Sequence, residues 1–406
     1  MTGLQKRVVR SDLWIAPAFD ERMSTEQDIE LRIFSVRGNS AAAWDMLSAA
    51  HVYHISAAKD ELPREFFAGA ELLARCPHLL CVSAGGAGYD TVDVAACTAA
   101  GVLVVNQAGG NAVSVAEHTL AMILGISRRM IEGDRRMRRE IGYSREEVMG
   151  HEIRGKTVGL VGIGHIGTRV AALARAFGLE VIATDPLLSS EEITRRGAEP
   201  VTFEELLARS DCVSLHCPRD ASTLKLMNAD TFGRMKKGSI FITTARGGIH
   251  DEGALVQALR SGHLAGAGVD VWDQEPPPLD HPLLAMDNVF ATYHVAGVTH
   301  EARGNVAAIS AEQIIDLLAG NRPPALSTPK HGLPTKNGAR RFWAEVAHSL
   351  PTPPERDNRN ATHQRTPAPL RTGPGPVRCR CRPWHGVRGV SRATDQDDRV
   401  VCPRRW

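Results

Sequence analysis

Gly162, Gly164 and Gly167 have the spacing of a loop that binds the phosphates of a dinucleotide. Gly162 permits a tight turn, Gly164 lets the backbone approach a pyrophosphate, and Gly167 allows a helix to pack closely on a strand. A helix that starts here would add free N–H groups and the positive end of its dipole. Asp185 follows 18 residues after Gly167, where it can accept hydrogen bonds from ribose hydroxyls and repel a 2′-phosphate. The pattern predicts a site for NAD rather than NADP.

A strand, a helix and a second strand must hold these residues in place. Residues 157–161 form an apolar run directly before the loop, and residues 180–184 form a second run that ends at Asp185. Apolar residues between the two runs recur at the spacing of one helical face that ends at Gly178. This face consists of Val170, Leu173, Ala174 and Phe177. A lone GxGxxG also occurs as a glycine-rich turn of nonbinding α/β folds, but all these pieces in register favour dinucleotide binding.

Residues 1–330 alternate short β-type runs with helical patterns, which predicts an α/β fold with doubly wound parallel sheets. Early strand-like runs lie at residues 51–56, 79–83 and 102–106. A helical segment from about Ser114 to Arg139 is apolar at first and then very basic. Its length suits a bridge between two domains.

The composition is that of a globular protein, with 43% hydrophobic and 23% charged residues among 406. The longest apolar run in a helical pattern, residues 119–126, is far shorter than the roughly 18 residues that a bilayer span requires. No charged segment followed by an apolar stretch and a cleavage site opens the chain, so secretion is not expected. Five cysteines before residue 331 lack CxxC spacing, which indicates buried thiols in a reducing cytoplasm. They are Cys76, Cys81, Cys97, Cys212 and Cys217.

Residues 331–406 differ from the rest of the chain. They hold 15 of the 48 Lys and Arg, 6 of the 46 Asp and Glu, and 10 of the 23 prolines. The preceding residues are therefore mildly acidic, and nothing in them suggests a nucleic-acid partner. Because this basic, Pro- and Arg-rich tail lacks periodicity, we expect it to be disordered. It is either an out-of-frame (frameshift) product or a natural tail, and Cys379 with Cys381 cannot close a zinc site.

Seven motifs in a fixed order make the chain resemble the D-isomer-specific 2-hydroxyacid dehydrogenase family over about residues 50–325. Their joint order is specific, although each alone is not. They are residues 84–90 (AGGAGYD), 115–118 (VAEH), the GxGxxG at 162–167, 216–218 (HCP), 244–248 (TARGG), 268–276 (GVDVWDQEP) and 294–297 (HVAG). The resemblance implies an NAD-dependent oxidoreductase that transfers a hydride between nicotinamide and C2 of a D-2-hydroxy or 2-oxo acid.

The catalytic residues that the resemblance implies agree with elementary chemistry. Arg246 is implied as the cation that binds the substrate carboxylate, because its guanidinium is a bidentate fork. His294 is implied as the general acid/base, since imidazole titrates near neutral pH. Glu275 is implied as its partner, a carboxylate that fixes the tautomer and stabilises the imidazolium. Taken singly, these three residues could be a surface arginine, a structural histidine and a loop acid.

The matched motifs also imply the contacts to substrate and cofactor. The backbone N–H groups of Ala87 and Gly88 are expected to meet the substrate carboxylate beside Arg246. The residues implied at the cofactor are Gly162, Gly164, His165, Ile166, Gly167, Asp185, Cys217, Pro218, Thr244, Ala245, Asp270 and Gly297. Asp270 is placed on the nicotinamide side, Cys217 is interpreted as packing rather than a nucleophile, and His118 as structural. No metal site is expected.

Some positions depart from the family pattern. Thr243 replaces a frequent Asn before the arginine, and Tyr293 replaces a frequent Pro before the histidine; neither change removes a group that the chemistry needs. Ile55 and Ala84 stand where phosphoglycerate enzymes usually carry cations, which weighs against D-3-phosphoglycerate as the specific substrate. Glu275 stands where formate dehydrogenases carry Gln, and it fits a reaction that moves a proton as well as a hydride.

The resemblance implies two Rossmann-like domains, with the cofactor domain inserted into the substrate domain. Residues 1–112 and 300–330 are assigned to the substrate domain, and residues 113–299 to the NAD-binding domain. Family members are usually homodimers built through the cofactor domains, and a cytoplasmic location without nucleic-acid or membrane partners is expected. Two alternatives stay open: an NAD-sensing binding protein of the co-repressor type, and an inactive product whose tail disturbs folding. Turnover of a 2-oxo acid would separate the enzyme from the co-repressor.

Overall fold

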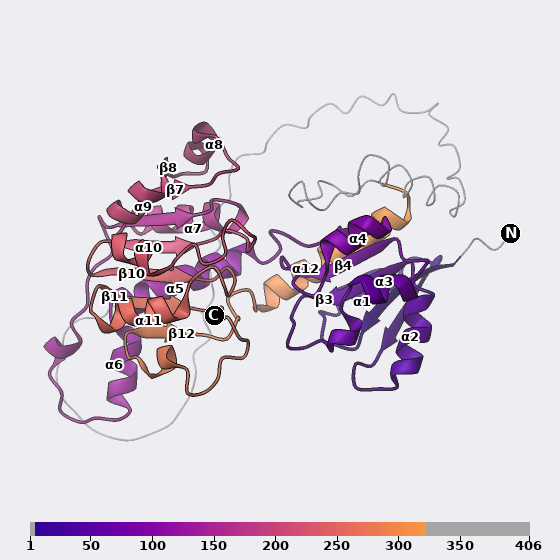
Figure 1. Cartoon of the computed structure of the whole chain (residues 1–406), viewed down its shortest axis with the longest axis horizontal. Helices are drawn as coiled ribbons and strands as arrows, with labels where there is room; N and C mark the ends of the chain where they lie inside the picture. The colour runs from indigo at the N-terminus through magenta and orange to yellow at the C-terminus, as the bar shows by residue number, and fades with distance from the viewer. Residues whose placement is uncertain (1–4, 322–406) are drawn as a thin grey trace, which may run out of the picture. The chain divides into compact units, whose positions relative to one another are not determined.

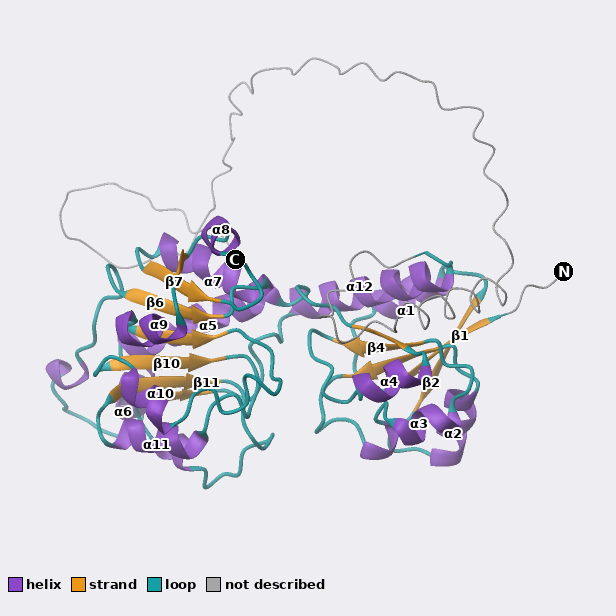
Figure 2. Ribbon diagram, turned by 45° about the horizontal axis from the view of Figure 1, so that its top comes forward, coloured by secondary structure: helices purple, strands orange, loops and turns teal. Residues whose placement is uncertain are grey.

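The computed structural model describes residues 5–321, whose strands form two parallel sheets (Figures 1 and 2). The five-stranded sheet contains β1 (Lys6–Ser11), β2 (Ile29–Phe34), β3 (Val52–Ser56), β4 (Cys81–Gly85) and β5 (Leu103–Val105). The seven-stranded sheet contains β6 (Thr157–Val161), β7 (Glu180–Thr184), β8 (Glu199–Pro200), β9 (Cys212–Leu215), β10 (Ser239–Thr243), β11 (Leu264–Val269) and β12 (Val289–Ala291). The doubly wound α/β fold predicted from the sequence is confirmed. The tail at 331–406 lies outside the described residues.

Helices connect the strands of both sheets. In the first part of the chain they are α1 (Ala18–Ser24), α2 (Ser40–Ser48), α3 (Ala70–Arg75), α4 (Val94–Ala100), α5 (Ala112–Ser127) and α6 (Met130–Met137). They continue as α7 (His165–Ala176), α8 (Ser190–Arg195), α9 (Phe203–Arg209), α10 (Ala229–Arg234), α11 (Glu252–Arg260) and α12 (His300–Leu318). Short 3-10 helices lie at Arg64–Phe66, Arg145–Val148 and Pro282–Ala285.

The five-stranded sheet has the order β2-β1-β3-β4-β5. Alternate residues of its strands face two separate cores, as the period of two along a β-strand requires. One core contains side chains of α2, α3 and α4, and the other contains side chains of α1 and α12. The last described helix therefore returns to the lobe that the chain builds first. We call this sheet with its helices the five-stranded lobe.

The seven-stranded sheet has the order β12-β11-β10-β9-β6-β7-β8. Helices α9, α10 and α11 pack on one face, and α5, α7 and α8 pack on the other. The order reverses between β6 and β9, and ligands of such sheets bind beyond the carboxyl ends of the strands at the point of reversal. We call this sheet with its helices the seven-stranded lobe.

The prediction of a single helix from about Ser114 to Arg139 is wrong. The segment is broken into α5 and α6 at Arg128 and Arg129, and Arg129 adopts a left-handed conformation with φ of 51°. The Arg129 side chain pairs with Glu132, three residues further on, which stabilises the new start. α5 packs on α7 and on β10 within the seven-stranded lobe.

The helix after the glycine loop ends close to the predicted position but buries fewer residues. Val170 and Ala174 are buried, whereas Phe177 caps the C-terminus and is 47% exposed. Of the five cysteines before residue 331, all are free thiols and only Cys217 is not fully buried. No helix within residues 5–321 is both long enough and apolar enough to cross a bilayer.

Candidate active site

The glycine loop lies at the point where the strand order of the seven-stranded sheet reverses. Gly162 follows β6 with φ of 92°, a conformation that favours glycine. A Cβ at Gly162 would lie 2.9 Å from the backbone N of Cys217, which follows β9. A Cβ at Gly167 would clash with the carbonyl oxygen of Gly162. These two glycines therefore permit the close contact of loop, helix and neighbouring strand.

The same loop fits the pyrophosphate of a dinucleotide. The first turn of α7 begins at Gly164 without a side-chain cap, so its backbone N–H groups are available to an anion. A Cβ at Gly164 would meet no atom within 4 Å, which means that the space in front of the loop is open. An NAD molecule bound here would meet the loop residues at its phosphates.

Asp185 stands directly after β7, as the sequence predicts, and its carboxylate binds the loop. Its Oδ2 accepts a hydrogen bond from the N–H of Ile163 at 3.1 Å, and its Oδ1 accepts one from Leu187 at 3.0 Å. A carboxylate has about four acceptor sites, so it can still accept from a ribose hydroxyl. The contact with ribose stays a prediction.

The other predicted cofactor residues line the same edge of the sheet in different ways. Cys217 packs against the core beneath α9 to α11, and burial raises the pKa of its thiol to about 11, in agreement with a packing role. Thr244 is buried with its hydroxyl 3.2 Å from that of Thr119 on α5. The carbonyl oxygen of Pro218 accepts a hydrogen bond from the Thr223 hydroxyl, and Ile166 packs against the core beneath α5 and α7. His165 lies beside Gly109, and Gly297 lies beside Asn111.

Arg246 follows β10 and reaches the glycine loop of the five-stranded lobe. Its Nε donates to Oδ2 of Asp90 at 3.0 Å, and its Nη1 donates to the carbonyl of Ala245 at 2.7 Å. Its Nη2 lies so close to Gly88 that a side chain there would clash with it. Arg219 binds the other oxygen of Asp90 at 2.8 Å, so two guanidinium groups share one carboxylate.

The loop that carries Ala87 and Gly88 presents free backbone donors. Neither N–H group has a hydrogen-bond acceptor within residues 5–321. Gln107 holds the loop from behind, since its Oε1 accepts from the N–H of Gly86 at 2.7 Å and its own N–H donates to Gly86 O at 2.8 Å. Its Nε2 donates to Gln313 of α12 at 3.2 Å.

His294 and Glu275 form a pair on two loops of the seven-stranded lobe. Nδ1 of His294 lies 2.9 Å from Oε2 of Glu275, and Glu275 Oε1 accepts from the N–H of Trp272 at 3.1 Å. Burial alone would raise the pKa of Glu275, but the hydrogen bond from His294, its charge and that of Arg246 outweigh burial and lower the pKa. Because an ionised carboxylate only accepts, Nδ1 of His294 is the donor. Nε2 has no hydrogen-bond partner in the described part of the chain and is the atom left for proton transfer.

Asp270 follows β11 and is fully buried beneath the loop that carries His294. Its carboxylate accepts hydrogen bonds from Thr292 Oγ1 at 2.6 Å, from the N–H of Val295 at 2.9 Å and from that of Ala296 at 3.0 Å. Its carbonyl accepts from the N–H of His294 at 2.6 Å. His118 on α5 adds a contact to Thr292 at 3.1 Å, which fits the structural role expected for it. The predicted contact of Asp270 with nicotinamide stays a prediction; what the contacts support is a role in positioning His294.

The fold thus brings together two groups of predicted residues. Arg246 meets the Ala87–Gly88 loop, and its charge lowers the pKa of Glu275, the partner of His294. Asp185 belongs to the half of the sheet beyond β6, away from the strands that carry Arg246 and His294. This arrangement can bind a carboxylate, hold a proton on Nε2 of an imidazole, and keep a dinucleotide at the same edge.

Sequence reasoning missed Asp90, Arg219 and Gln107 as functional residues. Asp90 ends the AGGAGYD motif and Arg219 directly follows the HCP motif, so both positions carried a signal that a search for charged neighbours of motifs would have found. Nothing in the local sequence marks Gln107, because its partners are Gly86 and Gln313.

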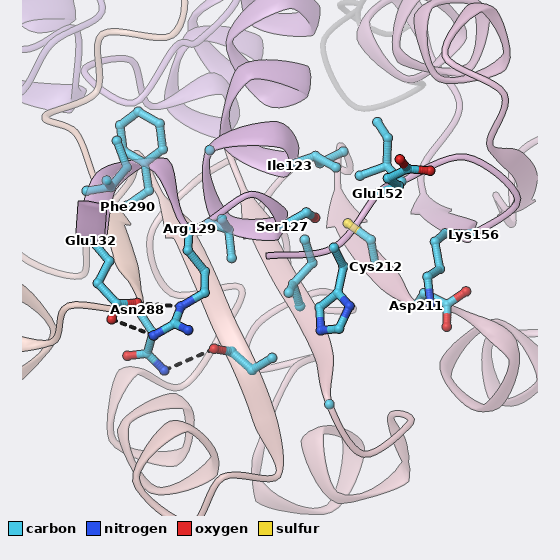
Figure 3. Close-up of a pocket in the computed structure, with 18 of the residues that line it drawn as sticks. Ile123, Ser127, Arg129, Glu132, Glu152, Lys156, Asp211, Cys212, Asn288 and Phe290 are labelled. Atoms are coloured by element: carbon cyan, nitrogen blue, oxygen red, sulfur yellow. Dashed lines mark hydrogen bonds and ion pairs between the residues drawn. The ribbon is translucent and has the colours of Figure 1, made fainter. Parts of the chain in front are cut away.

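A pocket of about 440 Å³ lies at the other edge of the seven-stranded sheet, where the strands begin (Figure 3). Lys156, Asp211 and Cys212 line it at the starts of β6 and β9, and the Arg129–Glu132 ion pair lines it from the side of α6. None of the predicted site residues lines this pocket. Within residues 5–321 no cluster of three or more candidate metal ligands occurs.

The residues of the seven-stranded lobe match a known family of domains. Residues 120–296 match the family model described as D-isomer specific 2-hydroxyacid dehydrogenase, NAD binding domain. A D-3-phosphoglycerate dehydrogenase of Archaeoglobus fulgidus is 41% identical over 251 residues, which are 62% of this chain and 47% of the relative. The chain therefore matches about half the length of that relative.

Two further relatives are matched over most of their length. A glyoxylate reductase of Korarchaeum cryptofilum is 36% identical over 260 residues, covering 63% of this chain and 78% of the relative. A D-lactate dehydrogenase of Aquifex aeolicus, solved with NAD and lactic acid, superposes with a TM-score of 0.67 at 27% identity. That likeness covers 77% of this chain and 96% of the solved one. The fold agrees with that of the solved D-lactate dehydrogenase.

Proposed function

This chain belongs to the D-isomer specific 2-hydroxyacid dehydrogenase family, and we propose that it transfers a hydride between NAD and C2 of a D-2-hydroxy acid or 2-oxo acid. NAD is the cofactor of the domain that residues 120–296 match. The observation that carries the proposal is the His294–Glu275 pair, 2.9 Å apart, together with Arg246 packed against the loop that carries Gly88.

Each protein group has one task in the proposed reaction. Arg246 binds the substrate carboxylate through its guanidinium fork, and the N–H groups of Ala87 and Gly88 donate to the same carboxylate. Nε2 of His294 donates a proton to the carbonyl oxygen during reduction and accepts one from the hydroxyl during oxidation. Glu275 stabilises the imidazolium, and NAD supplies or accepts the hydride when bound. Closure around the substrate excludes water.

Steady-state kinetics with a panel of 2-oxo acids tests this function. We expect turnover of at least one of glyoxylate, hydroxypyruvate, pyruvate or a longer-chain acid with NADH. Arg246→Lys keeps the charge but loses the fork, so it should mainly raise the KM for the oxo acid and also lower kcat. Binding of NADH without turnover of any acid in the panel would contradict the proposal.

Asp185 supports a preference for NADH over NADPH. Its carboxylate lies at the end of β7 beside the glycine loop, where a 2′-phosphate would be repelled. D-3-phosphoglycerate is the less favoured substrate, because Ile55 and Ala84 provide no cation for a phosphate. Both points belong to the proposal.

We propose that residues 1–112 and 300–330 form the substrate domain and residues 113–299 the inserted NAD-binding domain. The packing of α12 on β1 and β3 side chains supports the return of the chain to its first domain. Residues 322–330 lie outside the described part, so α12 is the support for the second segment.

We also propose that the protein is a cytoplasmic homodimer built through the seven-stranded lobe. Residues 128–150 expose four large apolar side chains, the last of which also lines the pocket described above. These are Met130, Met137, Ile141 and Met149, which are 60%, 67%, 105% and 65% exposed. Exposed apolar patches are typical of protein interfaces. The free thiols support a reducing compartment.

A further inference from the structure

The loop after β3, residues 57–62, reaches the loop that carries His294. The Tyr293 hydroxyl donates a hydrogen bond to Oδ2 of Asp60, a residue 233 positions away in the chain. Asp60 belongs to the five-stranded lobe, and Tyr293 follows β12 of the seven-stranded lobe. The contact therefore connects the two lobes directly beside the proposed general acid.

No step of the proposed reaction requires the hydrogen bond between Tyr293 and Asp60. A second charged connection between the lobes in the described part of the chain, from Asp90 to Arg246 and Arg219, belongs to the carboxylate-binding group. The Tyr293 hydroxyl, in contrast, bonds to neither Arg246 nor Glu275 within the described residues. Its only hydrogen-bond partner there is Asp60.

Tyr293 lies between residues that are held from the inside of the seven-stranded lobe. Thr292 donates to the buried carboxylate of Asp270, and the N–H of His294 donates to the Asp270 carbonyl. His294 itself has φ of 45°, an uncommon conformation for a residue with a side chain, and such conformations persist only where surrounding contacts enforce them. The loop is thus anchored by Asp270 on one side and by Asp60 on the other.

We propose that the Tyr293–Asp60 hydrogen bond is a latch that favours the closed arrangement of the two lobes and holds His294 against the bound 2-oxo acid. Tyr293 and Asp60 are positioning residues. The inference rests on the proposed function, because it assigns the latch to that reaction. A contact made only in the closed state shifts the population toward closure, and a ligand that needs the closed state then binds more tightly.

The donor is suited to this task at working pH. The hydrogen bond to Asp60 and burial raise the pKa of Tyr293 to about 12, so the phenol keeps its proton. Asp60 is exposed and Tyr293 is 43% exposed, which means that both partners can separate into water when the lobes open. The hydrogen bond therefore contributes modestly and reversibly.

A double-mutant cycle on the full chain tests the latch. Tyr293→Phe and Asp60→Ala should each raise the KM for the best oxo acid by about 3- to 10-fold, the range expected for one net hydrogen bond. The double variant should be no worse than either single variant, because both remove the same contact. The Kd for NADH should change less than twofold. Tyr143→Phe is the matched control, since its hydroxyl has a single hydrogen-bond partner within residues 5–321, the carbonyl of Gly133 in α6.

Two further measurements separate the latch from a general loss of structure. Asp60→Asn keeps an acceptor for the phenol, so it should restore most of the parental KM. In hydrogen exchange with NADH and the oxo acid bound, residues 57–62 should exchange faster in Tyr293→Phe than in the parent. Additive effects of the two single variants, or unchanged KM and unchanged exchange, would overturn the latch. Absence of turnover in the parent would instead overturn the proposed function.

Discussion

At the scale of single residues, the proposed role of the His294–Glu275 pair can be tested most directly. His294→Ala should lower kcat for oxo-acid reduction by about 10²- to 10⁴-fold, the usual contribution of a general acid, while the Kd for NADH changes little. Single-turnover and steady-state kinetics with fluorescence titration of NADH measure both. Near-parental turnover of His294→Ala would contradict the catalytic assignment.

Glu275→Gln tests the same pair through the pH profile. The carboxylate is ionised at working pH because its pKa is lowered, despite burial, by the hydrogen bond from His294. A nearby anion favours the protonated imidazole, which is the acid form that reduction needs. Removing the anion makes that form scarcer at a given pH. The alkaline limb of the kcat/KM profile should therefore move toward lower pH, and an unmoved limb would rule out the electrostatic role of Glu275.

Asp185 controls the choice of cofactor in this proposal. Asp185→Ala should narrow the preference for NADH over NADPH, because it removes the charge that repels a 2′-phosphate. The ratio of kcat/KM for the two cofactors measures the effect in the parent and the variant. Equal efficiency of NADH and NADPH in the parent would show that Asp185 does not discriminate.

His250 is a buried residue whose effect on the free energy of unfolding can be measured. Both ring nitrogens are buried without a hydrogen-bond partner within residues 5–321, and the Phe241 ring centroid lies 5.7 Å from that of His250. Because unsatisfied buried polar groups cost about 1–3 kcal/mol, His250→Leu should raise the free energy of unfolding by about 1–2 kcal/mol. Denaturant unfolding measures this, with the exposed His78→Leu as control. A destabilised variant would contradict the prediction that the unsatisfied ring of His250 lowers the stability of the fold.

The same residue affects the pH dependence of stability. Burial lowers the pKa of His250, although Glu252, Asp273 and Asp251 oppose the shift. The unfolded chain takes up a proton below about pH 6.5 while the folded chain resists it, so stability is present above that pH and is lost as pH falls. His250→Leu should lose less stability than the parent between about pH 6.5 and 5.

At the scale of elements, the contact between α7 and the loop after β6 decides whether the cofactor fits. Gly167→Ala would place a methyl group against the carbonyl of Gly162 and push α7 away from the loop. We expect a loss of about 1–3 kcal/mol in the free energy of unfolding and a weaker Kd for NADH. Gly233→Ala in α10 is the control, because its Cβ would meet no atom within 4 Å. Unchanged NADH binding in Gly167→Ala would show that close packing here is not required.

At the scale of the whole molecule, the exposed segment after α5 predicts the oligomeric state. Met137→Glu combined with Ile141→Glu should convert the proposed dimer into a monomer, because two charges would be buried in the interface. Light scattering after size-exclusion chromatography measures the mass. Leu279→Glu, a 98% exposed residue outside this segment, is the control. A parent that runs as a monomer would contradict the dimer.

Much of the fold could be predicted because its signals are local. The runs at 157–161 and 180–184 match β6 and β7, and the glycines between them mark the turn and the start of α7. Periodicity and glycine spacing act over a few residues, so they can be read directly from the sequence. The break at Arg129 could not be predicted, because the apolar pattern changes gradually while the backbone turns at one residue.

Only the tertiary structure decided which distant side chains meet. Arg246 and Asp90 are 156 residues apart, Tyr293 and Asp60 are 233 apart, and Gln107 and Gln313 are 206 apart. The sequence by itself determined the dinucleotide loop and the family of candidate catalytic residues, since each lies within a short motif. The partners of those residues depend on how two sheets and a returning helix pack, and no local pattern encodes such a contact.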